Sequence, residues 1–403
     1  MKYIIILGDG MADRPLASLQ NKTPLMVANI PNIHTFCRLG SCGLYQTVPL
    51  DMPPGSEVAN LAVLGYDVHQ VYQGRGVLEA ASLNIPITGD DLVMRCNLIC
   101  IESGLIRNHS AGHIGTEEAH QLIDFLNTRL ADEQVRFYPG FSFRHVLVVK
   151  NGMNDLKLTP PHDVPGKPFA SYLAQATSAR GEATANKLNE LILASQRLLP
   201  DHPVNRSRML AGRDPANSIW PWSAGYKPQM PTFQDKFGIR GAVISAVDII
   251  KGLGLLAGMD VIPVAGATGL IDTNYEGKAE AAVQALQDHD LIYLHVEATD
   301  EAGHAGEVDL KIKALELLDQ RVVKRILEAY EESSQNLTVA ILPDHATPCE
   351  VRTHTHDPVP FLICNPLSLP DQVEVYQEES VRHGRFGLIR DDQFIRLLLN
   401  RIH

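Results

Sequence analysis

Short apolar runs of strand length alternate along most of this chain with stretches that repeat apolar residues at helical spacing. The short β-branched runs predict buried strands, and the periodic stretches predict helices. The expected strands occupy residues 3–7, 261–264, 291–296, 337–342 and 361–364. The expected helices occupy residues 57–64, 243–257, 278–286, 308–326 and 391–400. Because parallel strands need crossover helices, this alternation predicts an α/β fold with a largely parallel sheet flanked by helices on both faces.

In the middle of the chain the alternation of expected strands and helices is less regular. Strands are expected there at 92–101 and 145–150, and helices at 117–130 and 182–199. Two proline-rich segments, TPPHDVPGKP and DPANSIWPWSAGYKPQMP, interrupt the pattern. A chain of 403 residues is also longer than one ordinary core requires. We therefore predict a smaller α/β domain at residues 86–234, inserted into a first domain made of residues 1–85 and 235–403.

Composition and charge exclude several classes of protein. A net charge of −12 leaves no basic excess to neutralise nucleic-acid phosphates. The apolar run near the N-terminus is too short for a signal peptide, and no run reaches the roughly 18 residues of a membrane span. The six cysteines form no CxxC pair, which fits a reducing compartment. We expect a soluble cytoplasmic protein without nucleic-acid or membrane partners, and make no prediction of its oligomeric state.

Acidic and histidine side chains follow three of the expected strands. They are Asp9, Asp300, His304, Asp344 and His345. The carboxyl ends of parallel strands share one edge of a sheet, so these side chains should converge, and HTHDPVP adds His354 and His356. Carboxylates and imidazoles suit Mn²⁺, Zn²⁺ or Mg²⁺, and this set exceeds what one ion needs. The pattern predicts two metal ions, an arrangement that stabilises the attacking and leaving oxygens of phosphoryl transfer.

Ser56 is the candidate nucleophile for such a site. It lies in DMPPGSEVANLAVLGYD, where a Pro-Pro-Gly turn opens an expected helix. Amides at the start of a helix can hold a phosphate, and a metal can lower the pKa of a serine hydroxyl. The alternative is that Ser56 is an ordinary helix N-cap. The acids and histidines at the strand ends favour the nucleophile.

Six motifs together resemble a known enzyme family. They are GDG, GSEVANLAVLGYD, YQGRG, TDEAGH, PDHATP and HTHDPVP, in that order from residue 8 to about residue 360. They resemble the alkaline-phosphatase superfamily and, within it, the cofactor-independent phosphoglycerate mutases of archaeal type. The resemblance implies an alkaline-phosphatase-like metal domain with an inserted substrate domain, which agrees with the division above.

The resemblance also implies a role for each site residue. Ser56 would be phosphorylated transiently, and His356 would lie beside the metal ligands without being one. One metal would be held by Asp300, His304 and His354, and the other by Asp9, Ser56, Asp344 and His345. Mn²⁺ is the first choice for both ions, with Zn²⁺ and Mg²⁺ as alternatives.

A phosphorylated acid also needs cations, and arginine can contact phosphate or carboxylate with two hydrogen bonds. Arg144 enters the apolar strand of FSFRHVLVV, where an unpaired charge would be costly. Together with the resemblance, this predicts a set of substrate contacts. The set is Arg144, Arg75, His113, His109, Asp163, Lys236 and Arg240.

The expected activity is the interconversion of 3-phosphoglycerate and 2-phosphoglycerate through a phosphoserine, without bisphosphoglycerate. The substrate would be a small phosphorylated carboxylic acid. A homoserine-kinase-like phosphotransferase stays open, because LTPPHDVPGK, SFRH and DPANSIWPW resemble a bacterial branch for which homoserine phosphorylation has been proposed. A metallophosphatase and a non-catalytic binding protein are further alternatives. Free phosphate as the product would indicate the former, and absence of bound metal the latter.

Overall fold

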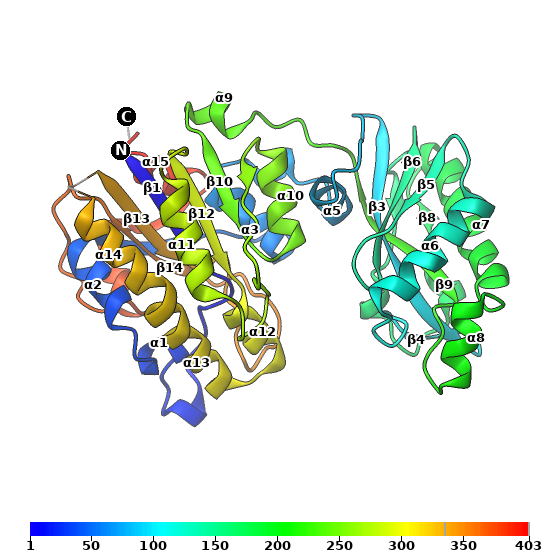
Figure 1. The fold of residues 1–403 in the computed structure, drawn as a ribbon, viewed down its shortest axis with the longest axis horizontal. Coiled ribbons are helices and arrows are strands. Elements are labelled where there is room, and N and C mark those ends of the chain that lie inside the picture. The colour runs from blue at the N-terminus through cyan, green and yellow to red at the C-terminus, as the bar shows by residue number, and fades with distance from the viewer. Residues whose placement is uncertain (334–335, 402–403) are drawn as a thin grey trace. The chain divides into compact units, whose positions relative to one another are not determined.

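A computed structural model describes residues 1–333 and 336–401 of the chain (Figure 1). The chain divides into two compact units, the first formed by residues 1–72 and 230 onward, the second by Gln73–Gln229. The second unit begins earlier than the expected residue 86, because helix α5 (Arg75–Ser82) packs on strand β3 (Asp91–Glu102). The approach is so close that a Cβ atom at Gly76 would lie 2.7 Å from the Met94 backbone.

The sheet of the first unit confirms the predicted largely parallel α/β architecture. Its described strands follow the order β11-β10-β12-β1-β13-β14-β2-β15. The run from β11 to β13 is parallel, β14 is antiparallel to both its neighbours, and β15 is parallel to β2. The strands are β1 (Lys2–Gly8), β2 (Ser41–Gln46), β10 (Gly241–Ile244), β11 (Asp260–Val261), β12 (Leu291–Val296), β13 (Leu337–Leu342), β14 (Val359–Cys364) and β15 (Gly387–Arg390).

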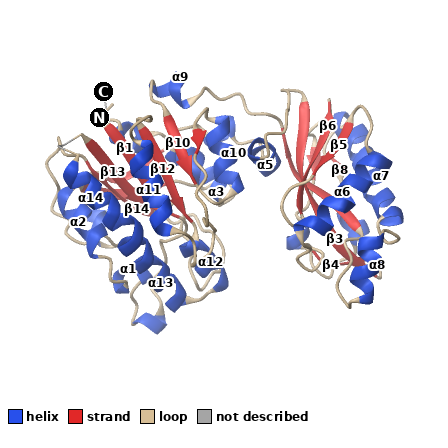
Figure 2. Ribbon diagram, in the orientation of Figure 1, coloured by secondary structure: helices blue, strands red, loops and turns tan. Residues whose placement is uncertain are grey.

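Helices cover both faces of this sheet (Figure 2). Helices α2, α11, α13 and α14 pack over a core that includes Ile4 and Ile292. On the other face, α10 contacts Val243, and Phe394 of α15 stacks on Tyr45 with ring centroids 5.6 Å apart. The helices are α1 (Pro24–Val27), α2 (Pro31–Leu39), α3 (Ser56–Val63), α4 (Val68–Val71), α9 (Phe233–Phe237), α10 (Asp248–Leu256), α11 (Tyr275–Ala285), α12 (Ala298–Ala305), α13 (Val308–Leu318), α14 (Lys324–Glu332) and α15 (Gln393–Leu398).

Three expected elements of the first unit differ from the structure. The helix expected at 243–257 is strand β10 followed by α10, because a four-residue strand buried on both faces has the same continuous apolar pattern as a buried helix. The helix expected at 308–326 is α13 and α14, joined by a π-helical turn at Asp319–Val323. The strand expected at 261–264 shrinks to the two residues of β11.

The second unit is built on an antiparallel sheet with helices α6 and α7 packed on one face. Alternate residues of β3, among them Leu92 and Met94, point into the core under these helices, while Ile99 packs with Trp220 and Trp222 on the opposite face. The sheet order is β4-β3-β6-β5, and β9 also pairs with β3. The elements are β4 (Leu105–Asn108), α6 (Thr116–Leu130), β5 (Val135–Tyr138), β6 (Arg144–Lys150), β7 (Leu156–Lys157), β8 (Gln175–Ala176), α7 (Glu182–Leu198), α8 (Pro203–Leu210) and β9 (Ser218–Gly225).

His145 makes the stability of this second unit depend on pH. Its imidazole is fully buried in β6, where Nδ1 accepts the Gly140 N–H at 3.0 Å and Nε2 has no hydrogen-bond partner among the described residues. Burial, together with nearby His120, lowers the pKa of His145 to about 3. The unfolded chain therefore binds a proton below pH 6.5 that the folded unit does not. The contribution of His145 to stability is therefore complete above that pH and is expected to fall by about 1.4 kcal/mol per pH unit as the pH drops toward 3.

We expect the variant His145→Asn to have a shallower slope by the share that His145 contributes, because the asparagine oxygen can still accept the Gly140 N–H but does not titrate. The measurement is urea unfolding at pH 5.0, 5.5, 6.0 and 7.5. Tryptophan fluorescence reports this unit, since both tryptophans of the chain lie in β9. Leu147→Ala on the same face of β6 is the matched cavity control and should keep the slope. Equal slopes in parent and His145→Asn would refute the assignment.

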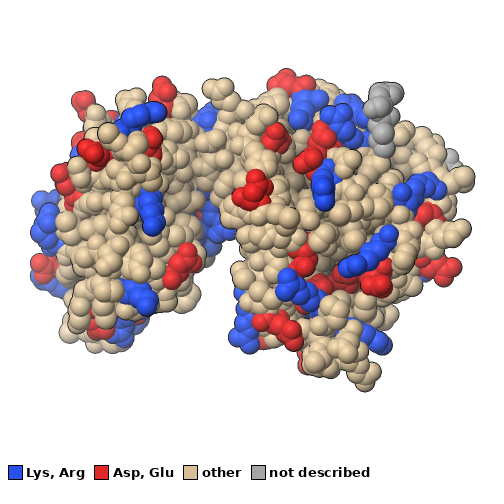
Figure 3. Space-filling view, turned by 180° about the vertical axis from the view of Figure 1, so that it is seen from behind, with Lys and Arg blue, Asp and Glu red and all other residues tan. Residues whose placement is uncertain are grey.

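Three further features of the described residues are the charge on one face of the molecule, the character of the helices and the state of the cysteines. On the face drawn in Figure 3, lysine and arginine side chains lie intermixed with aspartate and glutamate. None of the helices in the described part of the chain has both the length and the apolar character to cross a membrane. All six cysteines are buried free thiols.

Candidate active site

Three neighbouring parallel strands of the first unit end at one edge of the sheet. Strand β1 lies between β12 and β13 and is parallel to both. Asp9 follows β1, and Asp344 and His345 follow β13. Helix α12 begins two residues after β12 and presents Asp300 and His304 on one side, four residues apart. The side chains predicted to converge from the strand ends therefore lie close together.

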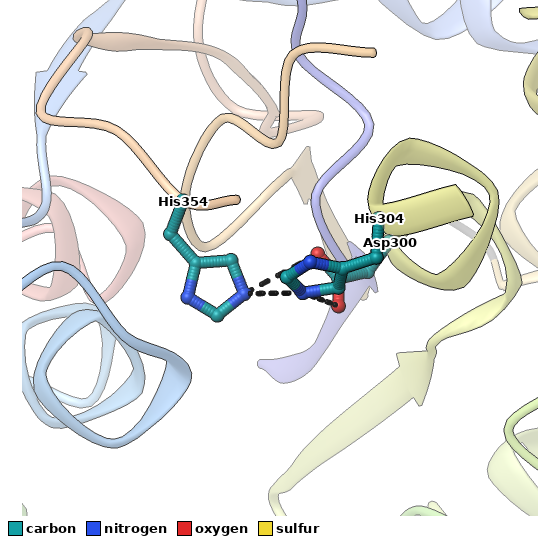
Figure 4. A group of neighbouring side chains, drawn as sticks. All are labelled: Asp300, His304 and His354. Carbon is teal, nitrogen blue, oxygen red and sulfur yellow. Dashed lines mark hydrogen bonds and ion pairs between the residues drawn. The ribbon is translucent and has the colours of Figure 1, made fainter. Parts of the chain in front are cut away.

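Asp300, His304 and His354 form one group of potential ligands, whose rings and carboxylate point toward one another in Figure 4. Nε2 of His304 lies 3.2 Å from the Asp300 carboxylate, and Nε2 of His354 lies 3.6 Å from it. Nδ1 of His304 donates to the Arg352 carbonyl at 3.1 Å, which leaves Nε2 facing the group. Burial would raise the pKa of Asp300, but the hydrogen bonds from both histidines outweigh it and hold the pKa well below its usual range.

A second group surrounds Asp9. Nε2 of His345 lies 3.6 Å from Asp9 Oδ1 and 3.4 Å from Asp344 Oδ2. His295, on β12, places Nε2 3.0 Å from Asp9 Oδ2. All four side chains are buried. Burial, with the nearby Asp344 and Asp300 carboxylates, raises the pKa of Asp9 well above its usual range.

This arrangement fits divalent cations. Asp9 Oδ1 is a buried carboxylate oxygen that accepts no hydrogen bond from the described residues. Buried carboxylates that face one another are costly unless a cation neutralises them. Potential ligand atoms lie within 4.8 Å of one another in three sets, namely Asp300, His304 and His354; Asp9, His295 and Asp344; and Asp9, Asp300 and His345. Oxygen and imidazole donors of this kind suit Mn²⁺, Zn²⁺ or Mg²⁺.

Ser56 lies beside the second group at the start of α3. Its Oγ is 3.0 Å from His345 Nε2. The N-cap position of the helix is Gly55, and no side chain caps it. The Ser56 side chain therefore does not act as the helix cap that was the alternative for this residue.

The second glycine of the GDG motif, Gly10, stands where the structure leaves no room for a side chain. Its φ of +61° lies in the left-handed region, and a Cβ atom there would come within 2.5 Å of Asp300 Oδ1 and Thr347 Oγ1. Its backbone N–H donates to Asp344 Oδ1 at 3.2 Å. A side chain at this position would push apart the segments that carry the two groups.

Proteins of known name resemble this chain in sequence. A family model described as 2,3-bisphosphoglycerate-independent phosphoglycerate mutase matches residues 37–205. A protein of that name from Methanosarcina mazei is 48% identical over 402 residues, which cover 99% of this chain and 100% of the relative. This chain belongs to the 2,3-bisphosphoglycerate-independent phosphoglycerate mutase family. The resemblance carried by the six motifs is thereby confirmed, and the chain is a member of a family of isomerase enzymes.

Two solved structures share the fold over nearly the whole chain. A cofactor-independent phosphoglycerate mutase from Thermoplasma acidophilum is 28% identical, with a TM-score of 0.70 and coverage of 99% of both chains. A protein from Pyrococcus horikoshii is 29% identical, with a TM-score of 0.84 and coverage of 100% of this chain and 98% of that chain.

Several of the predicted substrate residues lie close together in the second unit. The rings of His109 and His113 lie 5.7 and 6.2 Å from Phe143, and the Arg144 guanidinium is 5.7 Å from the same ring. Asp163 lies 3.6 Å from His162, whose ring is 6.0 Å from His109.

Residues that the sequence analysis did not select extend this cluster. His162 contacts Trp222 with centroids 5.2 Å apart, and Arg95 stacks over Trp222 at 5.0 Å. Burial lowers the pKa of His162, and the charges of Arg95 and Arg75 lower it further, although Asp163 opposes them. The alternation of apolar and polar residues in β3 is the signal that could have identified Arg95.

Lys236 and Arg240 do not lie with either group of metal-ligand candidates. Arg240 directly precedes β10 and pairs with Asp260 at 2.9 Å, so it lies at the amino ends of the parallel strands, opposite the edge that carries Asp9. Lys236 in α9 places its ammonium 5.5 Å from the Tyr66 ring. They were selected as cations that flank the expected inserted domain, and neither charge nor that position in the chain indicates an edge of the sheet.

The structure adds buried polar residues behind the two groups. Asn60 donates to the Ser56 carbonyl at 2.7 Å and to Asp344 Oδ2 at 2.8 Å, and the Tyr293 hydroxyl donates to its side-chain oxygen. Asn60 follows Ser56 by one helical turn, and Tyr293 and His295 share one face of β12. These two spacings were the signals in the sequence that could have identified Asn60, Tyr293 and His295. His356 instead contacts the Met52 carbonyl at 2.8 Å, in the segment that leads to Ser56.

Proposed function

We propose that this chain interconverts 3-phosphoglycerate and 2-phosphoglycerate through a phosphoserine at Ser56. The observation that carries the proposal is the Ser56 hydroxyl, 3.0 Å from His345 Nε2 and beside two groups of buried acids and histidines. Family membership supports the substrate, a small phosphorylated carboxylic acid. No bisphosphoglycerate is required, because the serine itself stores the phosphoryl group.

We also propose that the site binds two divalent ions, and that these are Mn²⁺ rather than Zn²⁺ or Mg²⁺. Asp300, His304 and His354 would hold one ion. The set for the other is Asp9, Ser56, Asp344 and His345. Bound ions would lower the pKa of the Ser56 hydroxyl and neutralise charge on the transferred phosphoryl oxygens.

The chain's own residues then have defined tasks. Ser56 gives up its hydroxyl proton and its Oγ bonds to phosphorus as the bond from phosphorus to the substrate's 3-oxygen breaks. The 3-oxygen takes up a proton, which leaves glycerate bound. The 2-hydroxyl of glycerate then loses its proton and attacks the phosphoserine, and the bond from phosphorus to Ser56 Oγ breaks as that oxygen is protonated again. Asn60 holds the first turn of α3 against Asp344 and so fixes the direction of Ser56. We assign contacts with the glycerate or phosphate to second-unit residues, namely Arg144, Arg75, His113, His109 and Asp163.

We also propose the cytoplasm as the compartment of this enzyme. The six cysteines form no CxxC pair, and all are buried. Cysteines of this kind suit a reducing compartment.

The test is phosphorus NMR of the Mn²⁺-loaded chain with 3-phosphoglycerate, without bisphosphoglycerate or nucleotide. We expect a growing 2-phosphoglycerate signal that reaches equilibrium with the substrate. Free phosphate as the only product would replace the mutase with a metallophosphatase. An unchanged spectrum, followed by phosphorylation of homoserine when a nucleotide is supplied, would establish the kinase-like alternative.

A further inference from the structure

Lys311 is a fully buried lysine in the first unit that the reaction proposed above does not use. It lies in α13, and its side chain has no exposed surface. A buried ammonium is costly unless each of its three N–H groups finds an acceptor. Lys311 meets this condition, because Nζ donates to the Ala12 carbonyl at 3.2 Å, the Asp13 carboxylate at 2.9 Å and the Thr347 carbonyl at 2.8 Å.

The three acceptors belong to the two loops that carry the second group of potential ligands. Ala12 and Asp13 continue the loop that begins with Asp9, and Thr347 continues the loop that begins with Asp344 and His345. The two loops also bond each other directly. The Thr347 N–H donates to the Ala12 carbonyl at 3.2 Å, and the Cys349 N–H donates to Asp13 Oδ2 at 3.1 Å.

The helix that carries Lys311 is itself continuous with the first group. Only Gly306 and Glu307 separate α13 from α12, which carries Asp300 and His304. Thr347 closes the connection, since its hydroxyl donates to Asp300 Oδ1 while its carbonyl accepts from Lys311. One ammonium therefore joins the three chain segments that carry Asp9, Asp300 and Asp344.

We propose that Lys311 is a positioning residue that holds these three segments at the spacing the metal ions require. The inference rests on the proposed two-metal function. Ligand atoms of Asp9 lie within 4.8 Å of those of Asp344 in one set and of Asp300 in another, and carboxylates this close repel one another before any cation binds. Contacts behind the carboxylates must therefore hold their segments together. Charge-assisted hydrogen bonds from a buried lysine are short and directional, which suits this task. Groups behind the ligands typically change metal affinity about 10- to 100-fold when removed.

A purely structural ion pair would also explain a buried lysine, so the test separates stability from metal binding. Lys311→Met alone would strand the Asp13 carboxylate in the interior, so the variant is the double Lys311→Met/Asp13→Asn, which removes both charges. The matched control is Asp319→Asn. Asp319 is also a buried charge and accepts from Ile33 N–H at 2.7 Å, yet it bonds α2 and not the metal-ligand loops.

Mn²⁺ binding to the metal-stripped full chain is measured by the loss of the electron paramagnetic resonance signal of free Mn²⁺, and unfolding midpoints are measured in parallel. We expect the Mn²⁺ dissociation constant of the double variant to rise about 10- to 100-fold, and that of Asp319→Asn to stay within about twofold of the parent. A double variant that folds and binds Mn²⁺ like the parent would overturn the role of Lys311. A parent that binds no Mn²⁺ would overturn the proposed function, and this inference with it.

Asp13→Asn alone is the second variant, in case the double variant does not fold. It keeps the ammonium and its two carbonyl acceptors but removes the opposite charge. We expect a smaller rise of the Mn²⁺ dissociation constant, about 3- to 10-fold. An unchanged constant in this variant would refute the proposal on its own.

Discussion

Ser56→Ala is expected to lower the rate of phosphoglycerate interconversion by at least about 10⁴-fold, as loss of a nucleophile does in other covalent mechanisms. The substitution removes the one oxygen that would carry the phosphoryl group. It should not disturb the fold, because the Ser56 side chain caps no helix and alanine has the higher helix propensity. Mn²⁺ affinity should fall only modestly, since the carboxylates and imidazoles remain.

The measurement pairs phosphorus NMR with mass spectrometry of acid-quenched protein. The parent should show a phosphorylated species during turnover, with the modification in the peptide that contains Ser56, and the variant should show none. Ser82→Ala, whose hydroxyl donates to the Glu79 carbonyl at 2.9 Å in α5, is the control and should retain full activity. A variant Ser56→Ala that turns over within tenfold of the parent would exclude the phosphoserine.

Asp300→Ala is expected to lose metal and activity together. Its carboxylate is the acceptor shared by His304 and His354, at 3.2 and 3.6 Å, so its removal leaves the two imidazoles without their common partner. It also removes one negative charge beside Asp9. We expect the apparent Mn²⁺ affinity to fall by at least about 100-fold, more than loss of a group behind the ligands would cause.

Metal content after dialysis, measured by atomic emission spectroscopy, checks this result and should show about one ion fewer per chain than the parent. Asp309→Ala, an exposed carboxylate on α13, is the matched control for loss of an acid from the same region. Full metal content in Asp300→Ala would remove Asp300 from the metal site, whatever the effect on the rate.

Much of the fold and of the candidate site could be predicted because both depend on local patterns. Asp9 and Asp344 each end a buried apolar run, and parallel pairing brings such ends to one edge of a sheet without further information. His295 and Asn60 were missed because their positions read as ordinary strand and helix interior. Tertiary contacts alone bring these side chains to the site. The pairing of β12 with β1 directs His295 at Asp9, and the packing of α3 on the sheet directs Asn60 at Asp344.

The remaining misses have similar causes. β10 was taken for part of a helix because four apolar residues next to an apolar helix carry no periodic signal of their own. Arg240 was selected for its charge. The end of the strand at which a residue lies decides which edge of the sheet it reaches, and Arg240 lies at the amino end of β10. Lys311 lies at helical spacing with Leu315 and Leu318, on the apolar side of α13, but it was not selected because lysine is usually a surface residue.

The position of β1 in the middle of the sheet has a consequence for synthesis on the ribosome. Tyr3 pairs with Leu291 and with Thr338, so the first strand is made almost 290 residues before either partner. At about 5 to 20 residues per second, it waits roughly 15 to 60 seconds. The second unit is a contiguous segment and can fold within that interval. The apolar N-terminal strand is thus the part of the nascent chain that most needs protection from aggregation until translation nears its end.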